Sequence, residues 1–175
     1  MAIGSELGFT VDVVPPVNAG GQPISSSRIR AALQRADMSE AQACLGRPYS
    51  LRGVVVRGDG RGRGLGFPTA NLRVGEQDKL IPPEGIYAVR AHLRSGAFVG
   101  ALHLGPRPTF KGSEPTIEVH LLDFDRDIYG EELRVDFLHH LREIRPFSTV
   151  AALVVQMHED VEAARRAVDA AGRIV

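Results

Sequence analysis

Hydrophobic and polar side chains alternate over several short stretches in the middle of the chain. A period of two is typical of strands that bury one face and expose the other. No long helical pattern separates these stretches, and turn residues such as Ser95-Gly96 and Tyr129-Gly130 join some of them. We therefore expect a mainly β protein whose antiparallel strands close into a small, Greek-key-like barrel. The expected strands cover residues 51–56, 85–93, 98–104, 116–122 and 132–138.

Near the C-terminus the period changes from two to three and four. This spacing predicts one amphipathic helix over about 149–171, with Ser148 as its N-cap and Gly172 at its end. A single apolar stripe implies that the helix packs on the barrel, which itself is expected over about 46–147. The stripe consists of Val150, Leu153, Val154, Met157, Val161, Ala164 and Val168.

The first 45 residues have a different pattern. A β-rich run over 9–14 ends at Pro15-Pro16, and two short helices are expected at 28–33 and 40–45. The first helix would be capped by the serines at 25–27, and the second would be capped by Ser39 and ended by Gly46. These elements bury too little apolar surface to fold alone. We therefore interpret residues 1–45 as a short helical remnant of a larger unit.

Composition narrows the function classes only slightly. The 175 residues include 21 Lys and Arg and 21 Asp and Glu, so the formal net charge is zero and favours neither nucleic acid nor membrane partners. Cys44 is the single cysteine, no apolar run is long enough to span a bilayer, and no signal peptide is apparent. We expect a cytoplasmic protein, with a monomer as the default.

The most unusual segment is the glycine- and arginine-rich run over 57–72, which has five glycines in the nine residues from Gly58 to Gly66. Such a run is not expected to form a packed element, because ordering glycine is costly. Its backbone N–H groups can approach an anion closely, and Arg61 and Arg63 add charge for phosphate oxygens. A flexible surface loop and an RNA-contacting loop are alternative readings. The segment is not a Walker A loop, since no Gly-Lys-Ser/Thr follows.

Two oxygen-bearing side chains follow this run. In extended backbone Thr69 and Asn71 point to the same side. A hydroxyl and an amide oxygen are hard ligands, which suit a Mg²⁺ ion that also binds nucleotide phosphates.

Several ordered motifs between about Leu45 and Arg165 resemble the riboflavin kinase family. They are the segment from Gly60 to Leu72, Pro-Glu-Gly-Ile-Tyr at 83–87, Gly-Pro-Arg-Pro-Thr-Phe at 105–110, Glu-Val-His-Leu-Leu-Asp-Phe at 118–124, Ile-Tyr-Gly at 128–130, and Leu-Arg-Glu at 141–143 with Phe147, Gln156 and Asp160. The resemblance implies transfer of the ATP γ-phosphate to the ribityl 5′-hydroxyl of riboflavin, giving FMN and ADP.

The resemblance also implies roles for individual residues. Glu118 would be the general base, and Thr69 and Asn71 would bind Mg²⁺. The expected flavin contacts are Leu122, Phe124, Arg142 and Phe147, although each apolar one is also compatible with plain core. The expected ATP and phosphate contacts are Gly60, Arg61, Gly62, Arg63, Gly64, Gly66, Pro68, Thr69 and Asn71.

Two features limit what the resemblance implies. Residues 13–15 and 24–30 are similar to the end of the FMN adenylyltransferase domain of bacterial bifunctional enzymes, so we expect 1–45 to be its remnant, 46–175 to be the kinase domain, and no FMN adenylylation by these 175 residues. His103 stands where the family usually has Asn, which puts pocket affinity in doubt. A flavin or nucleotide binder without turnover, and an RNA-binding barrel, stay open as other hypotheses.

Overall fold

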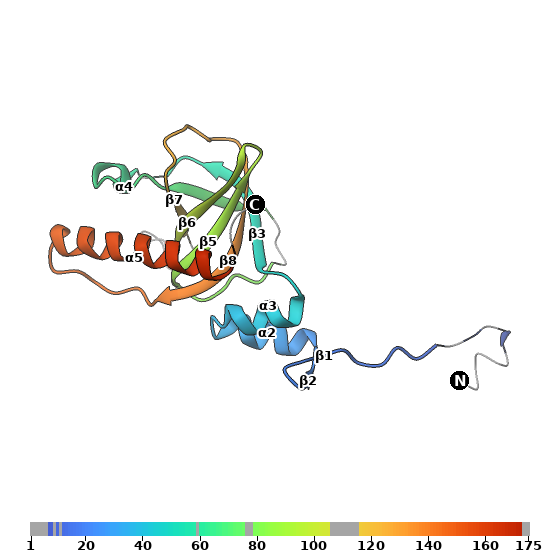
Figure 1. The fold of residues 1–175 in the computed structure, drawn as a ribbon. Helices are drawn as coiled ribbons and strands as arrows, with labels where there is room; N and C mark the ends of the chain where they lie inside the picture. Colours follow the sequence, from blue (N-terminus) through green and yellow to red (C-terminus); the bar gives the residue numbers. More distant parts are fainter. Residues whose placement is uncertain are drawn as a thin grey trace.

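The computed structural model describes residues 7, 8, 10, 12–58, 60–75, 79–105 and 116–172. A closed barrel occupies the centre, and a long helix, α5 (Val150–Ala170), crosses one side of it (Figure 1). Two short helices, α2 (Ser26–Gln34) and α3 (Met38–Leu45), lie at its lower end. The N-terminal segment extends away from the barrel. The predicted fold class, a small antiparallel barrel with a C-terminal helix, is confirmed.

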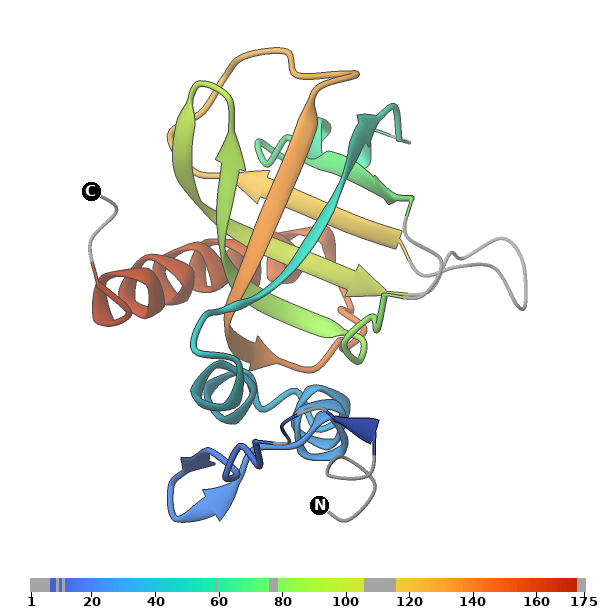
Figure 2. The same ribbon diagram turned by 90° about the vertical axis from the view of Figure 1, so that its right-hand side faces the viewer.

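The barrel has six strands, all paired antiparallel in the order β3-β4-β7-β6-β5-β8 (Figure 2). The five predicted strands are present, and β8 runs four residues further than expected, to Arg142. The sixth strand, β4, was not predicted as a strand. The strands are β3 (Tyr49–Val56), β4 (Ala70–Val74), β5 (Gly85–Leu93), β6 (Gly96–Gly105), β7 (Thr116–Leu121) and β8 (Glu132–Arg142).

Aliphatic side chains fill the barrel interior, as the alternation predicts. Tyr87 and Phe137 are fully buried among them, and their rings meet edge to face with centroids 5.2 Å apart. The Tyr87 hydroxyl donates a hydrogen bond of 2.6 Å to the Pro83 carbonyl, so its polar end is satisfied. Other buried interior residues are Leu51, Val55, Val89, Ala91, Leu102, Val119, Leu133 and Val135.

Burial of Tyr87 predicts a specific alkaline weakness. Burial, and secondarily the Glu143 carboxylate, raises the pKa of Tyr87 to about 12. The pKa of the phenol in the unfolded chain is about 10. The contribution of neutral Tyr87 to the free energy of unfolding is therefore fully present below that pH and is lost as the pH rises toward about 12. We expect Tyr87→Phe to lose less melting temperature than the parent across this window. The exposed-site variant Tyr129→Phe serves as control, and an equal loss in both variants would contradict the prediction.

Helix α5 (Val150–Ala170) begins one residue later than predicted. Its N-cap is Thr149, whose hydroxyl accepts a hydrogen bond from the Ala152 N–H at 3.1 Å, so the prediction of Ser148 as the cap was wrong. Both residues suit a cap, and only the backbone path selects between them. Val150 is exposed rather than part of the buried stripe, whereas Ala164 and Val168 are buried against the barrel side.

The N-terminal region forms a small hairpin and two helices: β1 (Asn18–Ala19), β2 (Gln22–Pro23), α2 (Ser26–Gln34) and α3 (Met38–Leu45). Ser25 caps α2 as expected, but α3 begins after Asp37, which accepts from the Glu40 N–H at 3.0 Å, and not after Ser39. The strand predicted over 9–14 is wrong for 12–14, which have no secondary structure; Phe9 and Val11 lie outside the described residues.

Arg28 holds this region together. Its guanidinium donates to the carbonyls of Ala19 and Gln22, each at 2.9 Å, and pairs with the Glu40 carboxylate at 2.9 Å. The side chain therefore has a structural role here, between the hairpin and the two helices.

Candidate functional site

The glycine-rich segment leads from β3 to β4 and contains one helical turn, α4 (Arg61–Gly64). The turn has only four residues, and Arg63 and Gly64 in it are exposed, which agrees with the expectation that the run forms no packed element. Gly60 begins the turn with a φ of 68°, and Gly66 leaves it with a φ of 86°, a region that favours glycine. Gly62 lies so close to Phe67 that a Cβ at Gly62 would be 2.3 Å from the Phe67 carbonyl oxygen.

Five residues form one row around the outer wall of the barrel, because each is the direct partner of the next on neighbouring strands. Asn71 of β4 pairs with Glu118 of β7, which pairs with His103 of β6. His103 pairs with Ile86 of β5, which pairs with Arg142 at the end of β8. Strand pairing thus places three predicted site residues, Asn71, Glu118 and Arg142, in the same row.

The catalytic candidate Glu118 is anchored by the loop. Its Oε2 accepts a hydrogen bond of 3.1 Å from the Thr69 hydroxyl, which lies just before β4. Thr69, Asn71 and Glu118 therefore form one polar cluster, as their predicted roles require. Asn71 packs over Gly58, where a Cβ would lie within 2.6 Å of all three terminal atoms of the amide.

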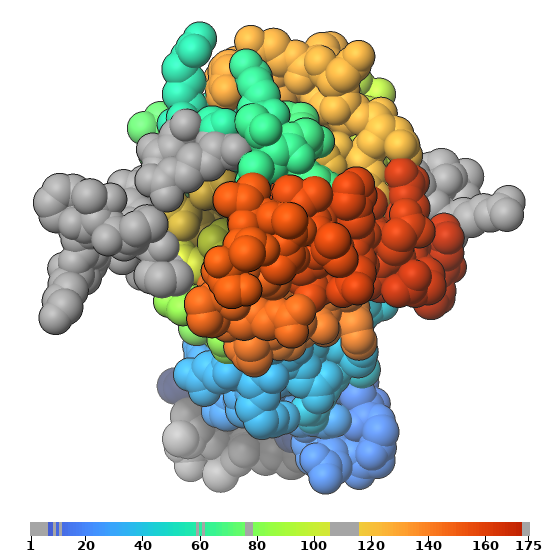
Figure 3. All heavy atoms as spheres, turned by 90° about the vertical axis from the view of Figure 1, so that its left-hand side faces the viewer, coloured from blue at the N-terminus to red at the C-terminus, as the bar shows by residue number. Residues whose placement is uncertain are grey.

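A cavity of about 310 Å³ lies between the outer wall and α5; we call it the helix-side cavity. Figure 3 shows α5 covering this face of the molecule, with the segment that includes the glycine loop directly above it. The cavity has the size and the mixed lining of a small-molecule site. Its lining includes Gly62, Leu65, Phe67, Thr69, Ile86, His103, Glu118, His120, Arg142, Ile144, Arg145, Phe147, Leu153, Met157, Asp160 and Val161.

A second cavity, of about 360 Å³, lies at one end of the barrel; we call it the barrel-mouth cavity. Four barrel-interior side chains form its floor, and the loop between β7 and β8 forms one side. Thr69 lines both cavities, so this residue lies at the boundary between them. The lining consists of Val55, Arg63, Pro68, Thr69, Ala70, Val119, Leu121, Phe124, Asp125, Arg126, Asp127, Ile128 and Tyr129.

The loop beside the barrel-mouth cavity is tied to α5. Asp123, with a φ of 56°, accepts two hydrogen bonds from Arg165 at 2.8 and 2.9 Å. These bonds hold the pKa of the Asp123 carboxyl below its usual value. One helix thus borders the helix-side cavity and anchors the loop of the other cavity.

A largely buried ionic network forms part of the lining of the helix-side cavity. Arg142 donates to both carboxylate oxygens of Asp160, at 2.8 and 2.7 Å, and Gln156 donates to Asp160 at 3.0 Å. Arg145 donates to Gln156 and lies over the Phe147 ring, as does Arg142. The bidentate geometry fixes the Arg142 guanidinium in place.

His103 occupies the middle of the row. Its ring lies over Gly105, where a Cβ would be 2.7 Å from the ring. Burial lowers the pKa of His103, although the Glu118 carboxylate acts in the opposite direction. A neutral imidazole beside Glu118 supplies a polar group to the cavity without competing for the carboxylate as a cation would.

The predicted flavin contacts separate in space. Arg142 and Phe147 line the helix-side cavity, Phe124 lines the barrel-mouth cavity, and Leu122 is buried and lines neither. Of the predicted phosphate contacts, Gly62 lines the helix-side cavity and Arg63 and Pro68 line the barrel-mouth cavity. The side chain of Arg61 and the motif residues 106–110 lie outside the described part of the structure.

Sequence reasoning did not identify Ile86 or the 125–129 loop as cavity-lining residues. The alternation over 85–93 places Ile86 on a strand face, but it does not say which other strands share its level. Among the described residues, no helix is long and apolar enough to cross a membrane.

The described residues thus form a barrel with two adjoining cavities, of which Thr69 lines both and Glu118 lines one. Residues 45–168 match the family model for riboflavin kinase. The chain is 40% identical to a bifunctional riboflavin kinase/FMN adenylyltransferase from Listeria monocytogenes, over 90% of this chain and 50% of the relative. The corresponding figures for the Haemophilus influenzae protein of the same description are 41%, 94% and 53%. The chain therefore belongs to the riboflavin kinase family.

Solved structures agree with this assignment of the fold. A crystal structure described as a macrolide-efflux protein from Streptococcus pneumoniae superposes with a TM-score of 0.86 at 37% identity, over 93% of this chain and 53% of that one. Riboflavin kinase from Trypanosoma brucei has a TM-score of 0.50 at 24% identity, over 70% of this chain and 81% of that one, and shares the fold. The chain spans about half the length of the curated relatives it matches, and the match is with their kinase half.

Proposed function

We propose that this chain is an ATP:riboflavin 5′-phosphotransferase, which converts riboflavin and ATP to FMN and ADP. The observation that carries the proposal is the place of Glu118: its carboxylate lines the helix-side cavity and holds the hydroxyl of Thr69, which lines both cavities. A transferase needs its two substrates to meet at one point, and this boundary is such a point. Residues 46–175 would form the kinase domain, and 1–45 would be the remnant of the preceding one.

The nucleotide would occupy the barrel-mouth cavity. Val55, Ala70 and Leu121 offer an apolar surface for the base, while Arg63 lies at the loop side for phosphate oxygens. The glycine turn would cover the phosphates with backbone N–H groups.

Riboflavin would occupy the helix-side cavity. Ile86, Phe147, Leu153 and Met157 offer apolar surface for a flat ring system, and the row of polar residues gives the cavity a hydrogen-bonding side. The ribityl chain would then point its terminal hydroxyl toward Glu118.

Magnesium would be held by Thr69 and Asn71. The donors fit this cation: both are neutral hard oxygens, and the close packing of Asn71 over Gly58 holds the amide beside Glu118. In the described part of the chain no group of three or more His, Cys, Asp or Glu is placed to hold a metal, so phosphates and water would complete the coordination. When bound, the cation neutralises charge on the transferring phosphate.

The protein groups would act as follows. Glu118 orients the ribityl hydroxyl and accepts its proton as the hydroxyl oxygen bonds to the γ-phosphorus and the bond to ADP breaks. The Thr69 hydroxyl holds the carboxylate in position. Packing of α5 over one side of the cavity would limit the access of water, which would otherwise compete as the nucleophile.

The test is incubation of the protein with riboflavin, ATP and Mg²⁺, followed by chromatographic separation of FMN and FAD. We expect FMN alone, and no product when a non-hydrolysable ATP analogue replaces ATP. Riboflavin binding without FMN would favour the non-catalytic binder, and FAD would contradict the restriction to the kinase reaction. Absence of flavin binding together with RNA binding would favour the RNA-binding barrel.

A substitution in the glycine turn tests whether this turn covers the nucleotide phosphates. In Gly62→Ala the new Cβ would meet the Phe67 carbonyl, so the turn must open. We expect nucleotide binding, measured by calorimetry with ADP and Mg²⁺, to weaken about tenfold, or about 1.4 kcal/mol. Gly75→Ala is the control, because Gly75 lies outside the predicted phosphate contacts and a Cβ there meets nothing within 4 Å. Equal affinities of the two variants would contradict this role of the turn.

A further inference from the structure

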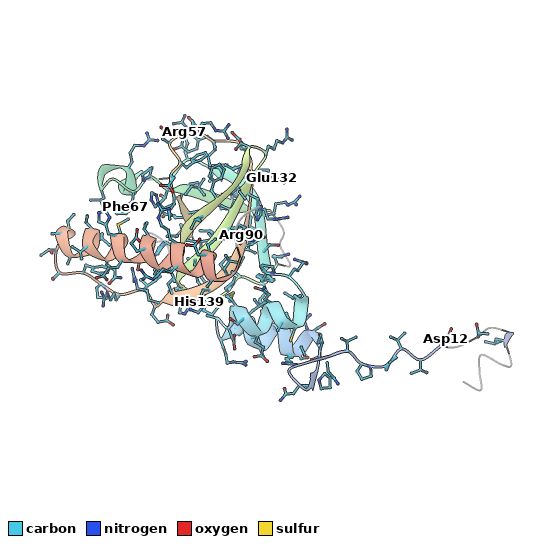
Figure 4. All side chains as sticks on the ribbon, in the orientation of Figure 1. Asp12, Arg57, Phe67, Arg90, Glu132 and His139 are labelled. Atoms are coloured by element: carbon cyan, nitrogen blue, oxygen red, sulfur yellow. The ribbon has the colours of Figure 1, made fainter. Side chains whose placement is uncertain are left out.

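One aromatic side chain of the glycine-rich segment is clamped between two histidines from distant parts of the chain. Phe67 is 5% exposed, and its ring lies edge-on to His120 of β7 and His158 of α5, with centroids 5.3 and 4.9 Å apart. Figure 4 shows Phe67 between α4 and helix α5. The end of the segment is thereby attached both to the barrel wall and to the helix.

His120 makes a second contact with the segment. Its Nδ1 lies 2.8 Å from the carbonyl oxygen of Pro68. A carbonyl only accepts, so Nδ1 carries the proton and donates. Pro68 has a fixed φ, so a bond to its carbonyl restrains the backbone that leads directly into Thr69.

The two contacts with this backbone come from one strand face. Glu118 and His120 are two residues apart on β7 and therefore point to the same side. Glu118 holds the hydroxyl of Thr69, and His120 holds the carbonyl of the residue before it. Strand β7 thus fixes two consecutive residues of the segment, and the hydroxyl of Thr69 cannot rotate away without breaking a hydrogen bond.

We propose that His120 is a positioning residue for phosphoryl transfer. By holding the Pro68-Thr69 backbone, it keeps Thr69 in place beside Glu118 and beside the cation that would bind the phosphates. The inference rests on the proposed function. The Phe67 ring packs against His120 of β7 and His158 of α5 and keeps the segment in contact with both elements. A displacement of about 1 Å at a reacting centre costs on the order of a hundredfold in rate, so loss of this anchor should affect the rate more than binding.

The test compares two substitutions at one position. His120→Phe keeps a ring against Phe67 but loses the hydrogen bond, whereas His120→Asn keeps an N–H donor at a similar distance from the backbone. We expect kcat of His120→Phe to fall by about tenfold or more, with KM for riboflavin and ATP changed by less than about threefold. His120→Asn should recover most of kcat. His139→Phe, on an exposed position of β8, is the control that keeps parent activity.

Hydrogen exchange of residues 62–69 gives a readout that does not depend on turnover. It should accelerate in His120→Phe and not in His120→Asn, while the melting temperatures of the two variants stay close. If the parent protein makes no FMN, the proposed function fails, and exchange alone then decides whether His120 anchors the segment. Parent-like kcat and exchange in His120→Phe, or equal losses of kcat in both variants with a matching fall in melting temperature, would overturn the inference.

Discussion

Glu118→Gln is expected to lower kcat by about 10²–10⁴-fold, which is the usual contribution of a positioned general base. Glutamine keeps the size of the side chain and an acceptor for the Thr69 hydroxyl, so the cluster at the cavity boundary should stay assembled. What is lost is the negative charge that orients the ribityl hydroxyl and receives its proton. Binding of riboflavin and of ADP with Mg²⁺ should change little.

Steady-state kinetics and calorimetry of the same preparations check this. Glu132→Gln is a matched control, since Glu132 lies exposed on β8 (Figure 4) and pairs with Arg52, which is also exposed, at 3.3 Å. That variant should keep parent kcat. Parent-like turnover in Glu118→Gln would refute the assignment of the base, and loss of riboflavin binding without loss of kcat would assign Glu118 to substrate binding instead.

Asp160→Ala is expected to destabilise the protein by about 2–3 kcal/mol. Asp160 is 7% exposed and accepts from Arg142 and from Gln156, so its removal leaves a largely buried guanidinium and a buried amide without their partner. Because the side chain of Arg142 retains 20% exposure, water compensates in part, and the cost lies at or just below the lower end of the usual range of about 3–5 kcal/mol. Riboflavin binding in the helix-side cavity should also weaken, because the Arg142–Asp160 pair joins the end of β8 to α5.

Urea unfolding at neutral pH measures the change, and riboflavin binding to the folded variant measures the effect on the cavity. Glu159→Ala provides the control: it removes a carboxylate from the exposed face of the same helix and should shift stability by less than about 0.5 kcal/mol. Equal stabilities of the two variants would show that the network contributes nothing measurable to folding.

The strands were largely predictable, because alternation reports directly on which side chains are buried. Residues 85–93 were predicted and observed with the same bounds. Strand β4 was missed because it has only five residues and follows directly on the glycine-rich segment, so its period is too short to recognise. The helix caps at Thr149 and Asp37 were missed by one or two positions, since several residues nearby suit a cap equally.

The family assignment was predictable for a different reason. The motifs from Gly60 to Leu72 and from Glu118 to Phe124 were recognisable without any fold, and the family model over 45–168 confirms the resemblance. The roles of individual residues in those motifs stay predictions. Phe124 was expected beside the flavin, but it lines the barrel-mouth cavity, because the loop after β7 turns over that end of the barrel.

Taken by itself, the sequence determined the barrel, the helix and the face of β7 that carries Glu118, since these follow from local periodicity. It could not determine which residues share the level of that carboxylate. Thr69 and Glu118 are 49 positions apart, and their hydrogen bond exists because β4 pairs with β7 in one register. A shift of one residue would turn every side chain of β4 to the other face. Register across the closed barrel, and the packing of α5 over it, therefore decided where the two cavities lie and that they meet at Thr69.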